Sequence, residues 1–466
     1  MMIYIDRNSS QPLYEQIYSH FSEEILTGTL AAGSRLPATR KLAEELSIGR
    51  NTVDRAYQQL TAEGYVQPRT GSGFIVNRIP IERIPQCSKK ILPAAVDDMS
   101  PSVRYDFAYG AMDNSVFPYN HWRKSLNNAL GMLEMSDSIH YPQRTGELAL
   151  RQEIVRYLYH SRGVSCKPEQ VVITCGQQHS MEIIANMFED TGKTFSMEDP
   201  GYDGIRTIFS NHNFHMNYIP VEKDGISIEC ATEFNTDLLY VTPSHQFPTG
   251  AVMSIGKRKE LLYWAEKSNT YLIEDDYDSE LRYYTNPIPS LQSLDKNSRT
   301  IYTGTFSKSL SPFMRLAYII FPQSLLPRYY KYYSRYNSQV STLHQLALAD
   351  FMASGCYERH LNRLRTFYKK KHTALLTAIS TVFGNSIEIS GEGAGLHLLL
   401  NVKGTLSQDE LIDKAGSIGI KVYSTKDLYA VASRCPVSQL LIGFPTIPHE
   451  AFEKIMYELK NVWDMS

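Results

Sequence analysis

The sequence predicts two folded parts, a small winged helix-turn-helix domain and a large α/β domain with a mainly parallel sheet. Three observations lead to this prediction. Residues 1–77 contain three amphipathic helical stretches followed by an alternating stretch. Residues 104–466 alternate helix-period stretches with short apolar strands, which is typical of a parallel sheet covered by helices. Residues 78–103 follow neither period and separate the two parts.

The overall composition is that of an ordinary folded protein. At 466 residues the chain is long enough for two or three domains, and 42% hydrophobic with 21% charged residues argues against disorder. No apolar run is long enough to cross a bilayer, and the N-terminus lacks the basic and apolar regions of a signal peptide. The six cysteines are scattered without a CxxC pair, which argues against disulfides and against a zinc site. We therefore expect a cytoplasmic protein with no membrane partner and no metal.

The first helix is expected to begin near Leu13. Leu13, Ile17, Phe21 and Ile25 recur every four residues and mark one apolar face. Gly28 ends the stretch, because glycine is the usual residue just beyond a helix.

Two shorter helices follow, in LPATRKLAEELSIGRNTVDRAYQQLTAEGY. Leu42 and Leu46 would face inward from the first, and Val53, Tyr57 and Leu60 from the second. The letters SIG supply the tight turn of a helix-turn-helix, and YVQPRTGSGFIV then alternates and turns at glycines like a β-hairpin wing. Any three-helix unit can show this apolar spacing, so the polar residues must decide whether it binds DNA.

Several polar side chains lie on the faces that remain once the apolar positions are buried. They include Arg40, Arg50, Asn51 and Thr52, and a helix N-terminus with Arg, Asn and Thr can contact both phosphates and base edges. The whole stretch from GTLAAG to GFIV resembles the winged helix of the GntR superfamily. The resemblance implies that Arg40 and Arg50 contact double-stranded DNA and that Gly71 of the wing enters the minor groove.

The charge of this domain argues for binding as a pair. Residues 1–77 hold seven Lys and Arg against eight Asp and Glu, and Asp54 stands where some GntR relatives carry a further DNA-contacting arginine. A single domain without net positive charge should bind DNA weakly, because phosphate neutralisation supplies much of the affinity. Two copies on one operator are therefore expected.

Residues 78–103 are predicted to be a linker between the two parts. Within residues 78–100, three prolines and two adjacent lysines favour an extended chain. A buried crossing strand is the alternative interpretation.

The predicted strands of the large domain end in unusual polar residues. In open parallel sheets, ligands bind at the carboxyl ends of the strands. The strands are expected in QVVIT, KTFSME, DLLYVTP, TYLIEDD, TIYTGTF and RLAYIIF.

Lys308 follows one of these strands, in TGTFSK. On composition alone it would be a surface lysine. A lysine that forms a Schiff base, however, must lie just beyond a strand with hydroxyls and a cation nearby to hold a cofactor phosphate, and Thr305, Ser307 and Arg315 meet that need.

Two further motifs are compatible with the same chemistry. In YLIEDDYD, the Asp275 carboxylate could cap a helix, bind a metal or pair with a protonated pyridine nitrogen, and Tyr277 could reach a ring hydroxyl. The letters TCGQQHS follow a strand and open a helix, whose free N–H groups form an anion site. Each of these motifs alone is weak evidence for a cofactor site, whereas their occurrence together and in this order is strong evidence.

From about residue 104 to its end, the chain resembles the fold-type I pyridoxal-phosphate aminotransferases, through GQQ, EDPGY, TPSHQFPTG, EDDYD and TFSK in that order. The resemblance implies a smaller C-terminal α+β subdomain. It also implies that Lys308 forms an aldimine with pyridoxal phosphate, that Asp275 pairs with the ring nitrogen and that Tyr277 binds the ring oxygen. The residues implied to cradle the phosphate are Gly176, Gln177, Gln178, Ser307 and Arg315, with Thr305 beside them.

Two tyrosines have implied roles around the cofactor. Tyr202 of DPGY would lie near the ring or the substrate, and Tyr141 of YPQRTG matches a tyrosine that reaches the phosphate of a neighbouring subunit. A homodimer is therefore implied. A GntR-type module joined to this body is the layout of the MocR/GabR-type transcriptional regulators, which TPSHQFPTG and EDDYDSELRY also resemble.

The chain departs from the aminotransferase pattern at two positions. Phe247 replaces an asparagine that holds the ring oxygen, which leaves that task to Tyr277 alone or to His245 nearby. Leu441 replaces the arginine that grips the substrate carboxylate, and an apolar side chain cannot form that bidentate pair. Arg206 and Arg434 are the candidates to replace it.

Three functions fit these observations: a regulator that binds pyridoxal phosphate and senses an amine, an amino acid or the cofactor itself, an active aminotransferase with an appended DNA module, and a repressor with an enzyme-like scaffold. The intact set of cofactor residues argues against the scaffold, and the two departures argue against the active enzyme. We expect the regulator, with at most weak transaminase activity.

Overall fold

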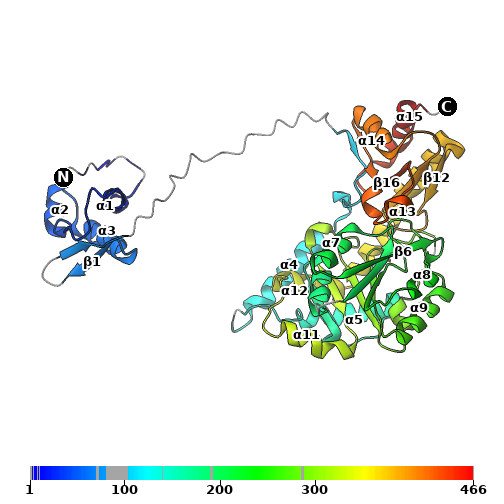
Figure 1. Ribbon diagram of the computed structural model, residues 1–466, viewed down its shortest axis with the longest axis horizontal. Helices are drawn as coiled ribbons and strands as arrows, with labels where there is room; N and C mark the ends of the chain where they lie inside the picture. Colours follow the sequence, from blue (N-terminus) through cyan, green and yellow to red (C-terminus); the bar gives the residue numbers. More distant parts are fainter. Residues whose placement is uncertain are drawn as a thin grey trace. The chain divides into compact units, whose positions relative to one another are not determined.

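The computed structural model divides the chain into two compact units, Met1–Asp98 and Met99–Ser466, shown in Figure 1. The residues that the structure describes are 3, 5–7, 9, 11–69, 73–79, 103–138, 140–188, 193–284 and 288–464. Most of the predicted linker, residues 80–102, lies outside this set, as does Gly71 of the predicted wing. No helix among the described residues is both long and apolar enough to span a bilayer.

The N-terminal unit has the predicted winged-helix fold. Its elements are α1 (Leu13–Leu26), α2 (Thr39–Glu45), α3 (Arg50–Ala62), β1 (Val66–Arg69) and β2 (Gly73–Val76). The strands pair antiparallel as the wing, and the core holds Ile17, Phe21, Val53, Tyr57 and Leu60. Between α2 and α3, Ser47 adopts a positive φ of 52° and the Ile48 amide donates to the Ala43 carbonyl, which makes the predicted tight turn.

The large unit is built on a twisted sheet with eight strands among the described residues. Their order across the sheet is β4 (Val171–Thr174), β11 (Ala317–Ile320), β10 (Thr300–Thr305), β9 (Tyr271–Asp276), β8 (Leu238–Val241), β5 (Thr194–Asp199), β6 (His215–Glu222) and β7 (Gly225–Ile226). The five strands from β10 to β6 run parallel, and β4, β11 and β7 are antiparallel to their neighbours. The expectation of a mainly parallel sheet is confirmed.

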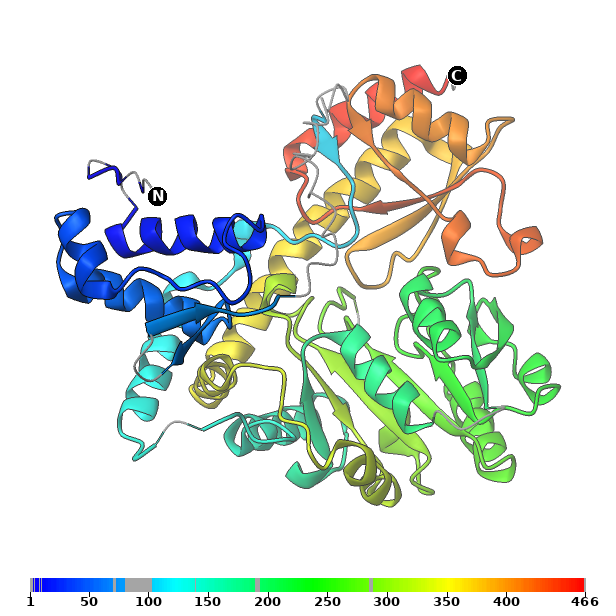
Figure 2. The ribbon, with the colours of Figure 1, turned by 60° about the vertical axis from the view of Figure 1, so that its left-hand side comes forward.

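Helices cover both faces of this sheet, as Figure 2 shows. Successive side chains of a strand point to opposite faces, so Tyr318 and Ile320 join one core cluster and Ile319 joins another. The helices are α4 (Tyr119–Glu134), α5 (Leu148–Arg162), α6 (Gln177–Met187), α7 (Asp203–Asn211), α8 (Ile228–Thr232), α9 (Ile255–Lys267), α10 (Leu291–Leu294), α11 (Leu326–Tyr333), α12 (Thr342–Ala353) and α13 (Cys356–Phe383).

The smaller C-terminal α+β subdomain is also present. A four-stranded antiparallel sheet runs in the order β12 (Ile387–Ser390), β13 (His397–Val402), β16 (Gln439–Gly443) and β15 (Tyr423–Ser424). The helices α14 (Gln408–Ser417), α15 (Phe452–Val462) and the long α13 pack with it in a shared core. A separate parallel pair joins β3 (Tyr105–Asp106) to β14 (Ile420–Lys421), so the start of the large unit is paired with its C-terminal subdomain.

Candidate functional site

A cavity of about 280 Å³ lies where strands β9 and β10 end and helix α6 begins. Such carboxyl ends of parallel strands are the usual ligand position in an open α/β sheet. The cavity is lined by Tyr109, Gly110, Gln177, Gln178, Tyr202, Tyr240, Phe247, Asp275, Tyr277, Thr305, Ser307, Lys308, Pro312 and Arg315. The structure therefore brings together nearly all of the residues that the sequence motifs suggested for a cofactor.

Lys308 reaches the cavity from the turn after β10. Its Nζ donates to the Tyr109 carbonyl oxygen at 3.1 Å and lies 4.0 Å from the centre of the Tyr109 ring. Burial lowers the pKa of Lys308 to about 8, although the Asp278 carboxylate opposes this shift. A larger share of this amine is therefore neutral near pH 7 than for an exposed lysine, which makes it a better nucleophile.

Asp275 lies near the end of β9 and has one carboxylate oxygen in use. The Tyr240 hydroxyl donates to Oδ2 at 2.5 Å, while buried Oδ1 has no hydrogen-bond partner among the described residues. Burial raises the pKa of Asp275 to about 7. A buried acceptor without a donor is costly, so this site suits a ligand that presents a protonated ring nitrogen.

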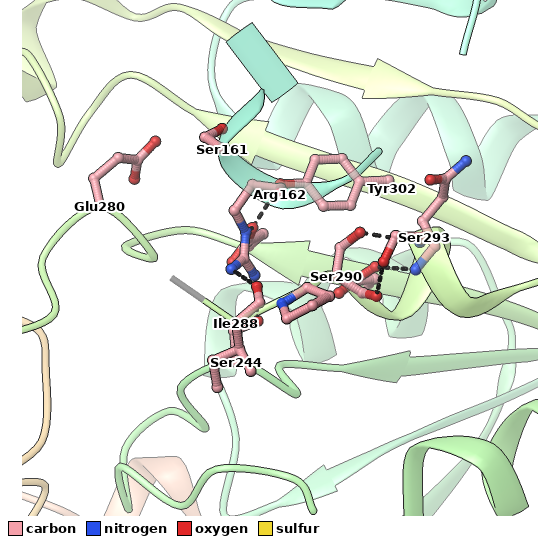
Figure 3. Close-up of polar contacts among 12 residues, drawn as sticks. Ser161, Arg162, Ser244, Glu280, Ile288, Ser290, Ser293 and Tyr302 are labelled. Atoms are coloured by element: carbon pink, nitrogen blue, oxygen red, sulfur yellow. Dashed lines mark hydrogen bonds and ion pairs between the residues drawn. The ribbon is translucent and has the colours of Figure 1, made fainter. Parts of the chain in front are cut away.

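The next carboxylate, Asp276, belongs to a structural network on the other face of β9. Figure 3 labels Arg162 and Tyr302, which bind this carboxylate. Arg162 Nε lies 2.6 Å from Asp276 Oδ2, the Tyr302 hydroxyl donates to that oxygen at 2.5 Å, and Arg162 also donates to Ser244 Oγ and to the Ile288 carbonyl. The pair is almost fully buried. It holds the end of β9 in place and so fixes the direction of Asp275.

The opposite end of the cavity is suited to an anion. Helix α6 begins after Gly176 without a side-chain cap, which leaves its first amides free to bind a phosphate. Gly176 has a φ of 100°, and a Cβ atom there would lie 2.5 Å from Arg315 Nη2. Only glycine therefore lets the Arg315 guanidinium approach this turn. Thr305 and Ser307 share a hydrogen bond of 3.0 Å beside it.

Three other predicted cofactor residues have clear positions. Gln177 Nε2 donates to Thr303 Oγ1 at 2.7 Å, and the Gln178 amide lies 3.4 Å from the Tyr202 hydroxyl. Tyr141, in contrast, is 83% exposed and does not line the cavity of its own chain. Its suggested contact with a second subunit remains a prediction.

The two candidate effector arginines do not line this cavity. Arg206 donates to the Asp427 carbonyl at 2.5 Å, and Arg434 Nη1 lies 2.8 Å from the buried Asp199 carboxylate. Leu441 is 7% exposed and packs in an apolar cluster with Phe247. The remaining members of this cluster are Tyr277, Leu399 and Leu428, with Tyr109, Tyr202, Tyr423 and Tyr429 packed against them.

Several residues of the site were not predicted from the sequence. Tyr109 lies far from Lys308 in the sequence, and only the fold brings the two into contact. Tyr240 lies within a buried strand, where an aromatic side chain is expected to belong to the core. Asp278 pairs with His245, and although Asp278 is the last residue of the EDDYD motif, the motif gave no indication of this contact.

The predicted DNA-contacting residues of the N-terminal unit lie on its surface. Arg40, Arg50 and Asn51 are exposed and Thr52 is half-buried. Arg40 and Arg50 border one surface hollow between α2 and the start of α3. Arg50 Nε is 3.3 Å from Asp54 Oδ2, so the acidic residue noted above partly neutralises this arginine.

Comparison with known proteins gives the same division of the chain. Residues 13–76 match the family of bacterial regulatory proteins, gntR family, and residues 106–434 match aminotransferase class I and II. The second family is pyridoxal-phosphate-dependent. The chain is also similar in fold to a multiple substrate aminotransferase from Thermococcus profundus, with a TM-score of 0.71 at 21% identity over 78% of this chain and 92% of that one.

Two relatives that match most of the chain have names that describe them as regulators. The chain is 38% identical to the uncharacterized HTH-type transcriptional regulator YdeL of Bacillus subtilis over 99% of this chain and 98% of that protein. It is 34% identical to the probable rhizopine catabolism regulatory protein MocR of Rhizobium meliloti over 89% and 86%. The chain thus belongs to the HTH-type transcriptional regulators of the MocR type, in which a gntR-family winged helix precedes an aminotransferase class I and II domain.

Proposed function

We propose that this regulator binds pyridoxal phosphate covalently at Lys308, binds its operator as a homodimer, and changes its affinity for that operator when a small ligand occupies the cofactor site. The ligand is an amine, an amino acid or the cofactor itself. The observation that carries the proposal is one cavity that combines a buried lysine of lowered pKa, a carboxylate with an unpaired oxygen and an uncapped helix N-terminus.

The residues present fit pyridoxal phosphate from end to end. When bound, this cofactor supplies an aldehyde that reacts with amines and a protonated ring that withdraws electrons. Lys308 would offer its neutral amine for the covalent link, and Asp275 Oδ1 would accept a hydrogen bond from the protonated ring nitrogen. The α6 amides, Arg315 and Ser307 would hold the phosphate.

The apolar cluster around Leu441 favours sensing over turnover. A transaminase must hold the substrate carboxylate while the Cα–H bond aligns with the ring, and a misplacement of about 1 Å can cost a hundredfold in rate. Leucine cannot provide that grip, and the guanidiniums of Arg206 and Arg434 are already bonded elsewhere. We therefore expect an amine, an unusual amino acid or pyridoxal phosphate itself as ligand, with negligible transamination of common amino acids. Sustained turnover of a common amino acid would put the enzyme alternative first.

The test is cofactor attachment in the purified full chain. Wild-type protein incubated with pyridoxal phosphate should develop a visible absorption band, and borohydride should fix the cofactor on the peptide that contains Lys308. The Lys308→Ala variant should show neither, whereas the exposed Lys259→Ala control on α9 should behave as wild type. A wild-type protein that stays colourless would refute the proposal and favour an enzyme-like scaffold.

A further inference from the structure

A buried histidine–aspartate pair lies directly behind Tyr277. His245 Nδ1 is 2.8 Å from Asp278 Oδ2 and 3.1 Å from the Tyr277 hydroxyl, and the side chains of His245 and Asp278 are only 2% and 3% exposed. Neither His245 nor Asp278 lines the cavity. We propose that His245 is a positioning residue that, together with Asp278, fixes the Tyr277 hydroxyl as a hydrogen-bond donor into the cavity. The proposal rests on the cofactor site proposed above.

The position of the proton on the His245 imidazole determines which hydrogen bonds His245, Asp278 and Tyr277 can form. An ionised Asp278 carboxylate can only accept hydrogen bonds, so the short contact to Nδ1 requires the proton on Nδ1. The other ring nitrogen, Nε2, is buried and has no hydrogen-bond partner among the described residues. A proton on Nε2 would leave a buried donor unsatisfied and two acceptors facing each other, which is the costlier arrangement. The geometry therefore favours the tautomer with Nδ1–H.

This tautomer determines what Tyr277 can do. With a proton on Nδ1, His245 cannot accept a hydrogen bond from the Tyr277 hydroxyl at that atom, and the tyrosine proton is free for another acceptor. Burial, followed by the Asp278 charge, raises the pKa of Tyr277 well above its usual value, so the hydroxyl stays protonated. Tyr277 itself lines the cavity. The Tyr277 hydroxyl therefore has no acceptor at His245 and can donate its hydrogen bond to an oxygen of a ligand in the cavity.

The surrounding chain holds the pair in this orientation. Gly395 has a φ of 77°, and a Cβ atom there would lie 2.5 Å from His245 Cε1 and 2.7 Å from Asp278 Oδ2. A Cβ atom on Gly250 would lie 3.3 Å from His245 Nε2. The imidazole is thus enclosed by two glycine turns, one of them from the C-terminal subdomain, and has little room to rotate.

Two neighbouring histidines do not supply a competing cation, whereas Arg282, which donates to the Ser244 carbonyl, is a cation that acts on the Asp278 charge. Burial lowers the pKa of His397 to about 3 and that of His372 to about 4, with the neighbouring His245 adding to both shifts. Both rings are neutral at physiological pH. The remaining charged and titratable groups that face this cluster are Arg282, Lys308, Tyr109, Asp275, Tyr240 and Tyr283.

The arrangement explains how the site works with Phe247 in its wall. Aminotransferases resembling this chain have an asparagine at that position to hold the ring oxygen, and phenylalanine has no donor. In this chain the donation falls to Tyr277, and its direction depends on His245 and Asp278. The pair would thus lower the proton affinity of a ligand held at Lys308, because a hydrogen bond to an anionic ring oxygen stabilises the deprotonated form.

Two substitutions of His245 separate this role from simple packing. The amide nitrogen of asparagine can occupy the place of Nδ1 and donate to Asp278, whereas the longer glutamine side chain carries its amide toward the place of Nε2. We would load wild type, His245→Asn, His245→Gln and Tyr277→Phe with pyridoxal phosphate and follow the visible absorption of each against pH. A fourth variant, His245→Leu, removes both ring nitrogens and leaves the Asp278 charge, which itself acts on Lys308, in place.

The pH midpoint of the absorption change should rise in Tyr277→Phe, and in His245→Gln and His245→Leu by roughly 0.5–1 pH unit, the equivalent of one hydrogen bond. His245→Asn should stay close to wild type. If Tyr277→Phe shifts while the glutamine and leucine variants titrate as wild type, the positioning role is refuted but the cofactor site stands. If wild type itself binds no cofactor, both proposals fail. Should the glutamine variant not fold, His245→Leu gives the same decision.

Discussion

Adjacent carboxylates at the end of β9 have opposite roles. Each keeps one buried oxygen without a partner among the described residues, but the other oxygen of Asp276 is paired with the Arg162 guanidinium and the Tyr302 hydroxyl, whereas that of Asp275 accepts only from the Tyr240 hydroxyl. The letters EDD do not distinguish them by composition. The difference arises because neighbouring strand residues point to opposite faces of the sheet, one toward the cavity and one into the protein.

Matched substitutions should separate these roles. Asp276→Asn leaves the buried Arg162 guanidinium without its counterion and should lower the free energy of unfolding by about 3–5 kcal/mol. Asp275→Asn should cost far less in stability but weaken pyridoxal phosphate binding, because an amide cannot keep a ring nitrogen protonated. Tryptophan fluorescence in urea measures the first effect in the large unit alone, because Trp122, Trp264 and Trp463 all lie there. Equal loss of stability in both variants would contradict this division.

The pKa of Lys308 predicts the pH dependence of cofactor attachment. Only the neutral amine attacks the aldehyde, and burial places the pKa of Lys308 at about 8. The rate of attachment should therefore rise from pH 6 and level off above the lysine pKa, as measured by the growth of the visible band in stopped flow. An exposed lysine has a pKa of about 10.4, so a rate that keeps rising beyond pH 10 would show that burial does not tune this amine.

At the scale of single elements, most of the site was predictable from sequence motifs. Lys308 and the GQQ turn each follow an apolar strand, Asp275 lies near the end of one, and β4, β9 and β10 form where those strands were expected. The strand β6 was not anticipated, since its side chains are mostly half-buried and it lacks the uninterrupted apolar run of the central strands. Tyr109 and Asp278 could not be assigned either, because their roles arise from contacts between segments far apart in the chain.

The turn before α6 gives a test at this scale. In Gly176→Ala the new Cβ would collide with Arg315 and occupy a backbone conformation that alanine resists, so affinity for pyridoxal phosphate should fall at least tenfold. Gly131→Ala is the matched control, because Gly131 lies within α4, has no neighbour within 4 Å of an added Cβ, and alanine favours helices. Titration of the absorption band with cofactor measures both. Unchanged affinity in Gly176→Ala would argue against phosphate binding at this turn.

At the scale of the whole molecule, the charge balance of the N-terminal unit predicts dependence on pairing. Residues 1–77 carry no excess of positive charge, and Asp54 partly neutralises Arg50. The isolated fragment should therefore bind operator DNA at least a hundredfold more weakly than the full chain, because a dimer gains effective concentration for its second half-site. Fluorescence anisotropy at one fixed salt concentration compares the two. Equal affinities would exclude the contribution of pairing.

The short pairing of β3 with β14 has a mechanical consequence. The segment that enters the large unit from the side of the DNA-binding domain is fastened to the C-terminal subdomain, through the Arg104–Glu458 ion pair, the Tyr423 hydroxyl on Asp106 and the backbone bonds around Phe107. Two residues after Phe107, the Tyr109 carbonyl oxygen accepts a hydrogen bond from Lys308 Nζ. A force transmitted along the chain from the N-terminal side would therefore act first on these contacts. The same short stretch contains the Tyr109 carbonyl, whose hydrogen bond Lys308 must break in order to react with a cofactor. One short backbone segment therefore both connects the large unit to the chain that precedes it and holds the Lys308 side chain before a cofactor binds.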